Sequence, residues 1–160
     1  MKPFVERYFL HLAALIVLLA AFNLFHRLGE SELQNWDESR YGITAYDMLR
    51  SGDFIRTTVL GVPDYWNLKP PLGYWAICAS YKIFGVNRFG LRFPAALSAL
   101  LCVILLMGLA RKYFSAGTAL LAGLILATNI HFITRHAGRS GDLDAMLTLL
   151  YLLFVWILAA

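Results

Sequence analysis

Four long stretches without a charged side chain constrain the fold of this chain more than any other feature. They cover residues 8–26, 93–110, 113–134 and 145–160, which are 19, 18, 22 and 16 residues of a 160-residue chain. An α-helix needs about 20 apolar residues to cross the roughly 30 Å hydrocarbon core of a bilayer. We therefore expect an all-α polytopic membrane protein with about four transmembrane helices, at about 8–27, 93–110, 115–134 and 144–160.

The composition excludes two large classes of protein. Hydrophobic residues make up 59% of the chain and charged residues 15%, whereas soluble domains average about 45–50% apolar and about 25% charged residues. A soluble enzyme is excluded, and so is a soluble nucleic-acid binder, despite the net charge of +4. Cys78 and Cys102 lie among apolar residues without a CxxC spacing, so we interpret both as small buried hydrophobic side chains.

The basic residues around the apolar stretches predict the topology. Lys2 and Arg7 precede the first stretch, and Arg111 and Lys112 separate the second from the third. Short loops rich in Lys and Arg stay in the cytoplasm, which places both sites inside and residues 28–92 outside. The first stretch is long for a cleavable signal and no small-residue cleavage site follows it, so we interpret it as a retained signal anchor.

The external segment 28–92 is too long to be a simple connector. It contains seven of the ten acidic residues and seven basic ones. Long loops in compact domains are usually functional or disordered, and the many aromatic and β-branched residues here argue against disorder. We expect a strand over 54–60 and, after two prolines, an apolar helix over Leu72–Phe84 that Gly85 ends and that is re-entrant or interfacial.

The first part of this segment predicts an amphipathic helix. Asn35 is the expected N-cap, Glu38 can reach back to the start, and Ser51-Gly52 provides a left-handed end. A helix of this kind is expected to lie flat on the outer membrane surface, which would place Asp37 at the boundary between lipid headgroups and water. Its apolar stripe consists of Tyr41, Ala45, Met48 and Leu49.

Three features of the external segment could carry chemistry. Adjacent carboxylates at Asp37 and Glu38 suit a general base or a metal ligand, but they equally suit solvated acids in the first turn of a helix. Arg40, one turn on, could bind a phosphate through its guanidinium fork or form a surface ion pair. Two prolines follow Lys69 and fix the backbone there. The Lys69 ammonium could therefore be a phosphate counterion held at a defined place, or it could snorkel beside the start of a helix.

A further charged cluster lies between the last two apolar stretches. Charges near the bilayer are costly and are functional candidates, although the two aspartates could simply cap the last helix. His131 and His136 lie nearby, but they are five residues apart and lack an evident third ligand, so a metal site is disfavoured. The cluster consists of Arg135, Arg139, Asp142 and Asp144.

These motifs resemble a known family, the integral-membrane glycosyltransferases of the C superfamily. That group includes the protein O-mannosyltransferases and the bacterial aminoarabinose–lipid A transferases. Each motif is short, but they occur in the order of the family and cover most of the chain from about 35 to 150. The motifs are residues 37–41 (DESRY), 48–54 (MLRSGDF), 69–75 (KPPLGYW), 84–87 (FGVN), 92–96 (RFPAA) and 139–147 (RSGDLDAML).

The resemblance implies an inverting glycosyltransferase on the periplasmic face of a bacterial inner membrane, with a polyprenyl-phosphate sugar as donor. The acceptor would be lipid A, another glycan or a protein. Asp37 matches the catalytic base, Arg40 and Lys69 match positions near the donor phosphate, and Asp144 matches a second acidic position. No metal ligand is assigned, and a requirement for a divalent metal stays open. The candidate substrate-binding residues are Glu38, Arg40, Tyr41, Lys69, Arg139, Asp142 and Asp144.

Two departures from the family pattern shape these expectations. Aminoarabinose transferases typically carry an acid just before Lys-Pro-Pro, where this chain has Leu68, so the sugar is left open. Members of the family are also much longer, so we interpret residues 1–160 as a single N-terminal membrane portion of a larger transferase. The alternative interpretation is a non-catalytic membrane subunit or remnant that keeps the fold and binds partner helices.

Overall fold

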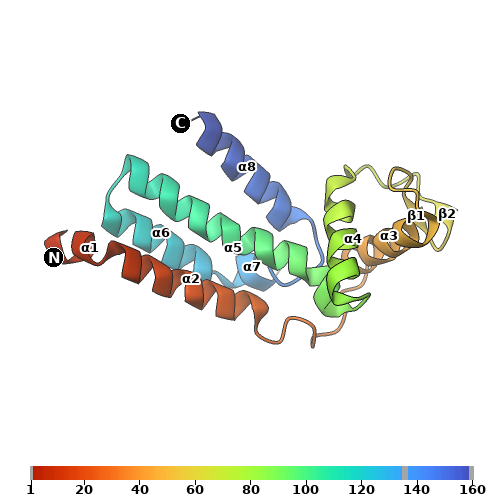
Figure 1. The fold of residues 1–160 in the computed structure, drawn as a ribbon, viewed down its shortest axis with the longest axis horizontal. Coiled ribbons are helices and arrows are strands. Elements are labelled where there is room, and N and C mark those ends of the chain that lie inside the picture. The colour runs from red at the N-terminus through yellow and green to blue at the C-terminus, as the bar shows by residue number, and fades with distance from the viewer. Residues whose placement is uncertain (1, 135–136, 159–160) are drawn as a thin grey trace.

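The computed structural model describes residues 2–134 and 137–158, and it is mostly helical. Figure 1 shows a bundle of long helices with a smaller lobe at one end. The helices are α1 (Lys2–Arg7), α2 (Phe9–Phe25), α3 (Asp37–Ser51), α4 (Leu72–Phe84), α5 (Arg88–Tyr113), α6 (Ala116–Thr128), α7 (Ile130–Thr134) and α8 (Asp144–Leu158). Strands β1 (Thr58–Val59) and β2 (Val62–Pro63) pair as an antiparallel hairpin.

The bundle is built around α5, which packs against α2, α6 and α8 (Figure 1). Small residues allow the helices to approach closely. Gly108 of α5 faces Trp156 of α8, and Gly123 of α6 faces Met107 of α5, each so closely that a Cβ would clash. Of the described helices, α5 is long and apolar enough to cross a membrane, with a mean hydropathy of 2.4 over an 18-residue window. Helices α2, α6 and α8 are apolar but have 17, 13 and 15 residues.

The third predicted span, 115–134, is interrupted. Helix α6 ends at Thr128, Asn129 adopts an extended conformation, and α7 begins at Ile130. The side chain of Asn129 accepts a hydrogen bond from the amide of Phe132, while Asn23 of α2 donates one to the carbonyl of Ala127. These amide side chains satisfy backbone groups near the break, which would be costly to leave unpaired in an apolar bundle.

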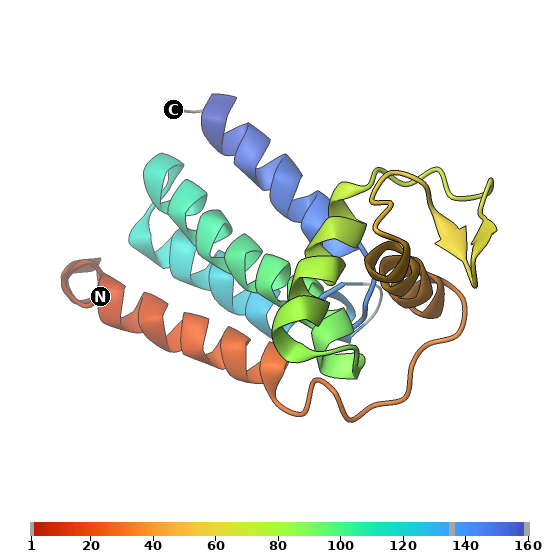
Figure 2. The same cartoon turned by 45° about the vertical axis from the view of Figure 1, so that its right-hand side comes forward.

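The lobe consists of α3, the hairpin and α4, and it lies at one end of the bundle (Figure 2). The apolar stripe of α3 is buried, but against α4 rather than against lipid. Tyr41, Ala45 and Met48 pack in one cluster with Tyr74 and Ile77 of α4. The expectation that α3 lies on the membrane through this stripe is therefore wrong, because α4 offers a complementary apolar face.

The predicted C-terminal ends of α3 and α4 were correct, but the predicted N-cap of α3 was wrong. Gly52 takes a left-handed conformation with φ 77° after α3, and Gly85, with φ 83°, ends α4 as expected. The N-cap position of α3 is occupied by Trp36, with φ 87°, rather than by Asn35. Glu38 does reach back, but its carboxylate accepts a hydrogen bond from the amide of Gln34.

The predicted strand over 54–60 is mostly loop. Asp53 accepts hydrogen bonds from the amides of Ile55 and Arg56 through one carboxylate oxygen, which turns the chain at that point. A side chain that bonds nearby backbone amides offers the chain an alternative to a strand. Strand pairing is left to Thr58–Val59 and Val62–Pro63.

Candidate active site

A cavity of about 240 Å³ lies in the lobe, between α3, the loop that follows β2, and the start of α4. Four residues that the sequence predicts for the site line it together: Asp37, Arg40, Tyr41 and Lys69. They come from two segments about 30 residues apart in the chain, so the fold itself brings them together. The other lining residues are Trp66, Asn67, Leu68 and Tyr74.

Local structure holds each of these groups in place. Asp37 is the first residue of α3, and Arg40 and Tyr41 follow one turn later. The side chain of Asn67 accepts hydrogen bonds from the amide of Lys69 (3.2 Å) and from the hydroxyl of Tyr74 (2.9 Å). The loop is thereby tied to α4 next to the two prolines, so the backbone of Lys69 is fixed.

The cations of the cavity have partners in this state. Arg40 forms a salt bridge with Asp64, with 2.5 Å between Nη2 and Oδ2, and this contact raises the pKa of Arg40. The ammonium of Lys69 lies 5.5 Å from the centre of the Tyr41 ring, and a hydrogen bond with the Tyr41 hydroxyl raises the pKa of Lys69. Asp37 and Asp144 add smaller raising effects on the pKa of Lys69. Both cations therefore stay charged at neutral pH and can balance a phosphate.

Glu38 points away from this cavity into the protein interior. Its carboxylate is buried with the guanidinium of Arg92, with Oε1–Nε and Oε2–Nη2 distances of 2.6 and 3.0 Å. The backbone amides of Gln34 and Gly141 also donate to it, at 2.7 and 2.8 Å. Burial raises the pKa of Glu38, but the Arg92 contact and the two amides outweigh burial and lower it. Glu38 therefore connects the start of α3 to α5 and to the loop before α8, and it does not line the cavity.

Arg92 is the main residue that sequence reasoning missed. Besides Glu38, its guanidinium donates to the carbonyls of Leu28, Ser31 and Glu32, at 3.0, 3.1 and 2.8 Å. It is the last charged residue before a long apolar stretch, and a charge in that position is usually paired or functional. The sequence could therefore have predicted that Arg92 is paired, but it does not identify Glu38 as the partner.

The described residues of the charged cluster before and at the start of α8 lie in different environments. Arg139 donates to the carbonyls of Asn23 and His26, both at 2.8 Å, and so caps the end of α2 away from the Asp37 cavity. Asp142 is buried and accepts a hydrogen bond from the hydroxyl of Ser140 at 2.9 Å. Asp144 is exposed at the start of α8, close enough to Lys69 to affect its pKa.

Possible metal ligands are scattered over the described part of the chain. Within residues 2–134 and 137–158, no group of three or more His, Cys, Asp or Glu side chains could hold a metal ion. His131 is exposed on α7. Arg135 and His136 lie outside the described residues, so the second histidine of the disfavoured metal site is not placed.

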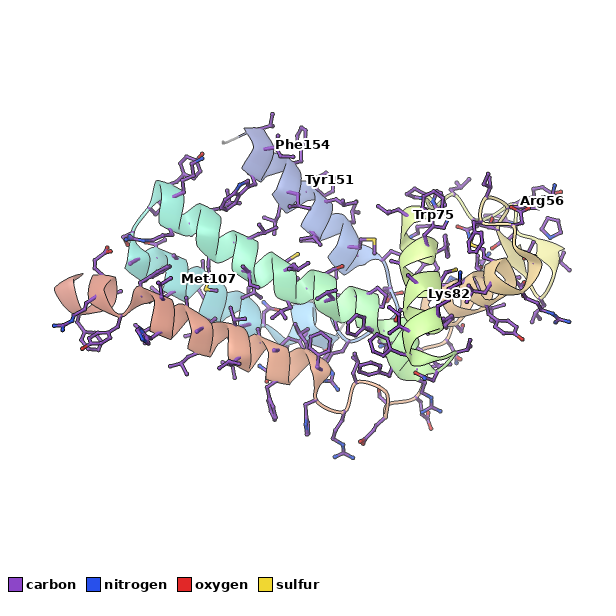
Figure 3. All side chains as sticks on the ribbon, in the orientation of Figure 1. Arg56, Trp75, Lys82, Met107, Tyr151 and Phe154 are labelled. Atoms are coloured by element: carbon purple, nitrogen blue, oxygen red, sulfur yellow. The ribbon has the colours of Figure 1, made fainter. Side chains whose placement is uncertain are left out.

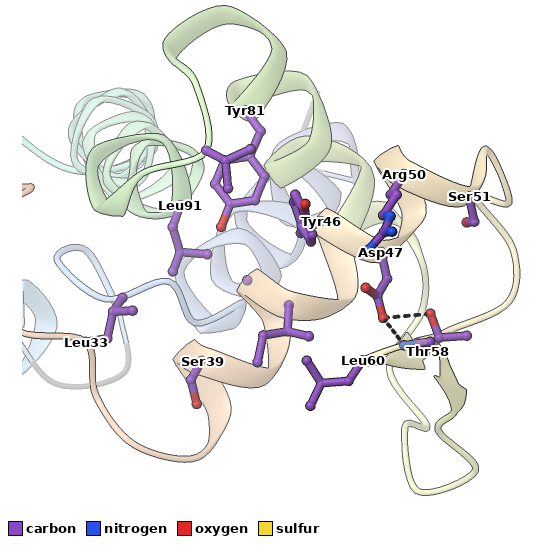
Figure 4. A pocket seen from close by; sticks show the side chains of 14 residues that line it. Leu33, Ser39, Tyr46, Asp47, Arg50, Ser51, Thr58, Leu60, Tyr81 and Leu91 are labelled. Carbon is purple, nitrogen blue, oxygen red and sulfur yellow. Dashed lines mark hydrogen bonds between the residues drawn. The ribbon is translucent and has the colours of Figure 1, made fainter.

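A larger cavity of about 780 Å³ lies on another face of α3, between the hairpin and the start of α5. Figure 4 shows Tyr81 and Leu91 at one end and Thr58 and Leu60 at the other. Asp47 accepts hydrogen bonds there from the Thr58 hydroxyl (3.0 Å) and the Gly61 amide (2.8 Å). Its carboxylate therefore anchors the hairpin on α3, while most of the cavity wall is apolar.

Comparison with known proteins gives a consistent family. The family model described as dolichyl-phosphate-mannose-protein mannosyltransferase matches residues 68–160. An undecaprenyl phosphate-alpha-4-amino-4-deoxy-L-arabinose arabinosyl transferase from Pseudomonas savastanoi pv. phaseolicola is 38% identical over 135 residues, which are 83% of this chain and 25% of that protein. Arabinosyl transferase 2 of the same kind from Pseudomonas fluorescens is 36% identical over 138 residues, 85% of this chain and 23% of that protein.

An uncharacterized protein from Aquifex aeolicus is 36% identical over 144 residues, which cover 89% of this chain and 28% of that protein. The chain thus spans about a quarter of the length of the curated relatives it matches. No solved structure matches it. Because the family model covers more than half of the chain, including Lys69 of the cavity and the whole of α5 and α8, this chain belongs to the dolichyl-phosphate-mannose-protein mannosyltransferase family.

Proposed function

We propose that this chain is part of a multi-pass glycosyltransferase of a bacterial inner membrane. The enzyme transfers a sugar from a polyprenyl-phosphate donor to lipid A, another glycan or a protein on the periplasmic face. The names of the Pseudomonas relatives support undecaprenyl phosphate as the carrier and an aminoarabinose as the first sugar to test. The observation that carries the proposal is the convergence of one carboxylate and two cations, Asp37, Arg40 and Lys69, on one cavity at the end of an apolar bundle.

The chemistry follows from the charges around the cavity. Asp37 removes the proton from an acceptor hydroxyl as the acceptor oxygen attacks the anomeric carbon of the donor sugar. The bond between that carbon and the phosphate oxygen breaks, and polyprenyl phosphate leaves with the bonding electrons. Arg40 and Lys69 balance the charge on the leaving phosphate. Attack from the face opposite the phosphate inverts the configuration of the sugar.

In this proposal the remaining candidates have supporting roles. Tyr41 contacts Lys69 and sets the position of its ammonium. Glu38, through Arg92, fixes the start of α3 and therefore the backbone of Asp37. Asp144 lies near Lys69 at the start of α8, where it can orient the acceptor or hold the ammonium. Arg139 and Asp142 stabilise the segment before α8.

The test is the Asp37→Asn variant in the full-length protein that contains this chain. It is assayed in membrane vesicles with undecaprenyl-phosphate-linked 4-amino-4-deoxyarabinose as donor and lipid A as acceptor, with transfer followed by mass spectrometry. Loss of a general base lowers turnover by about 10²–10⁴-fold, and we expect a decrease in that range.

The matched control is Asp53→Asn, because Asp53 is an exposed acid of the same lobe that lines neither cavity. We expect it to keep normal transfer. Transfer at the normal rate by Asp37→Asn would contradict the assignment of the base. Absence of transfer by the wild type with every donor would favour the alternative, a non-catalytic membrane subunit that binds partner helices. If neither variant nor the wild type uses the aminoarabinose donor, other polyprenyl-phosphate sugars are compared in the same vesicles.

A further inference from the structure

Three large side chains beside the Asp37 cavity are almost fully exposed. Tyr65 and Trp66 expose 88% of their surface and Leu68 exposes 92%. They lie in the loop between β2 and α4, and Trp66 and Leu68 also line the cavity. We call these three residues the rim. The cavity therefore has charged groups on its walls and an apolar, aromatic edge.

The rim lies next to the start of a bundle helix. A Cβ on Gly73, in the first turn of α4, would be 2.6 Å from Leu143, the residue directly before α8. Lys69, which follows the rim, is close enough to Asp144, the first residue of α8, for that carboxylate to raise the pKa of Lys69. Figures 1 and 2 both show the start of α8 against α4. The rim is thus held beside the end of the bundle at which α8 begins.

The neighbouring surface has the same character. Leu72 and Trp75 of α4 are about half exposed (46% and 44%), and Figure 3 shows Trp75 at the end of α4 that the rim loop enters. On α8, Leu147 and Tyr151 expose 51% and 64%. Exposed apolar side chains therefore occur on the bundle helix α8, on the start of α4 and on the rim loop. Large exposed apolar surface marks an interaction site.

We propose that the rim inserts into the outer-leaflet interface of the lipid bilayer. Trp and Tyr are enriched at the level of the lipid headgroups because their rings are apolar with one polar atom, and Leu68 next to them suits the upper acyl chains. Lys69 follows directly, and its ammonium turns to Tyr41 in the cavity. A lipid-linked phosphate can then reach Arg40 and Lys69 from the side, without its hydrocarbon leaving the membrane.

This inference rests on the proposed function in taking the apolar bundle as membrane-spanning and the ligand as lipid-linked. It is tested by site-directed spin labelling of the full-length protein in phosphatidylethanolamine–phosphatidylglycerol liposomes. Single nitroxides are placed through Trp66→Cys and Leu68→Cys. Cys78 and Cys102 are buried, and the signal from protein without an introduced cysteine is subtracted. Collision of each label with molecular oxygen, which concentrates in lipid, is compared with collision with water-soluble nickel-EDDA.

Two further labels calibrate the measurement. Leu18→Cys lies on α2 at a side chain that is 65% exposed, and it serves as the lipid reference. Glu32→Cys lies in the exposed loop before α3, and it serves as the water reference. We expect the labels at 66 and 68 to show an oxygen-to-nickel collision ratio several-fold above that of Glu32→Cys and close to that of Leu18→Cys.

Two results would overturn the inference. A ratio equal to that of Glu32→Cys would place the rim in water, and low collision rates with both reagents would show that another part of the protein covers it. The measurement reads lipid contact and not sugar transfer. A rim in water beside a wild type that transfers sugar therefore refutes this inference alone, and a rim in lipid beside a wild type that transfers no sugar refutes the proposed function alone.

Discussion

At the scale of single residues, the buried Glu38–Arg92 pair joins the first turn of α3 to the start of α5. Glu38 is next to the candidate base, so its proximity to the site could be predicted, but the direction of its side chain could not. The partner lies 54 residues away, at the start of α5. A buried carboxylate is tolerated when its charge is paired and its oxygens are hydrogen-bonded. Only the fold shows that Arg92 and two backbone amides meet both requirements.

The pair predicts a strong effect of Glu38→Gln on stability. The carboxylate accepts four hydrogen bonds. In glutamine an NH₂ group replaces one of the two oxygens, and this donor would face the donors that the oxygen now binds. Removing one partner of a buried ion pair costs about 3–5 kcal/mol, and we expect a destabilisation of that size. The control Glu32→Gln changes an exposed acid of the neighbouring loop. Thermal unfolding in detergent should separate the two variants, and equal midpoints would contradict the prediction.

The same pair predicts how stability depends on pH. The pKa of Glu38 in the folded protein is below its usual value of 4.5, so the unfolded chain binds a proton at a higher pH than the folded chain does. The stabilisation is then fully present above pH 4.5 and is lost as the pH falls through the folded pKa. We expect the difference in unfolding midpoint between wild type and Glu38→Gln to be constant from pH 8 to 6 and to shrink below 4.5. A difference that grows on acidification would be inconsistent with this pKa.

At the scale of elements, the helix ends and the apolar stripe could be predicted from the sequence, whereas the surface that the stripe packs against could not. The ends of α3 and α4 were predictable because Gly52 and Gly85 supply the conformations that a side chain disfavours. The stripe on α3 was also predictable, since it depends on helical spacing alone. Its partner was not, because packing against α4 and lying on a membrane need the same pattern. Asn129 was a visible polar interruption in an apolar stretch, and it marks the break between α6 and α7.

Glycine contacts give a prediction for the turn between α4 and α5. A Cβ on Gly90 would lie 2.6 Å from the carbonyl oxygen of Gly85, which is backbone and cannot rotate away. The nearest atom to a Cβ on Gly117 of α6 would be 3.8 Å away. Forcing atoms into a packed site costs about 1–3 kcal/mol, whereas Gly→Ala at a compatible site stabilises by about 0.4–1 kcal/mol. We expect Gly90→Ala to lower the unfolding midpoint and Gly117→Ala to raise it slightly. A shift of the same sign in both variants would argue against this packing.

At the scale of the whole molecule, the lobe lies at one end of the bundle (Figure 1). Helix α1 and the turn between α5 and α6, which carry the two basic sites, lie at the other end. Arg111, at the end of α5, forms a salt bridge with Glu6 of α1, with 2.5 Å between Nη2 and Oε2. The two basic sites that the sequence assigns to the cytoplasm are therefore neighbours in the fold. The positive-inside rule considers each loop separately, so this contact is independent support that the two sites lie on the same side of the bundle.

This arrangement makes the orientation testable with two single-cysteine variants of the full-length protein. Ile55 in the lobe is 85% exposed, and Phe114 in the turn after α5 is 72% exposed. Because the lobe is proposed to face the periplasm, a membrane-impermeant maleimide should label Ile55→Cys in intact spheroplasts. It should label Phe114→Cys only after permeabilisation. The buried thiols of Cys78 and Cys102 should give little background. The reverse pattern would put Asp37 on the cytoplasmic side, where an external acceptor could not reach it, and labelling of both positions in intact spheroplasts would show that the bundle does not separate the two compartments.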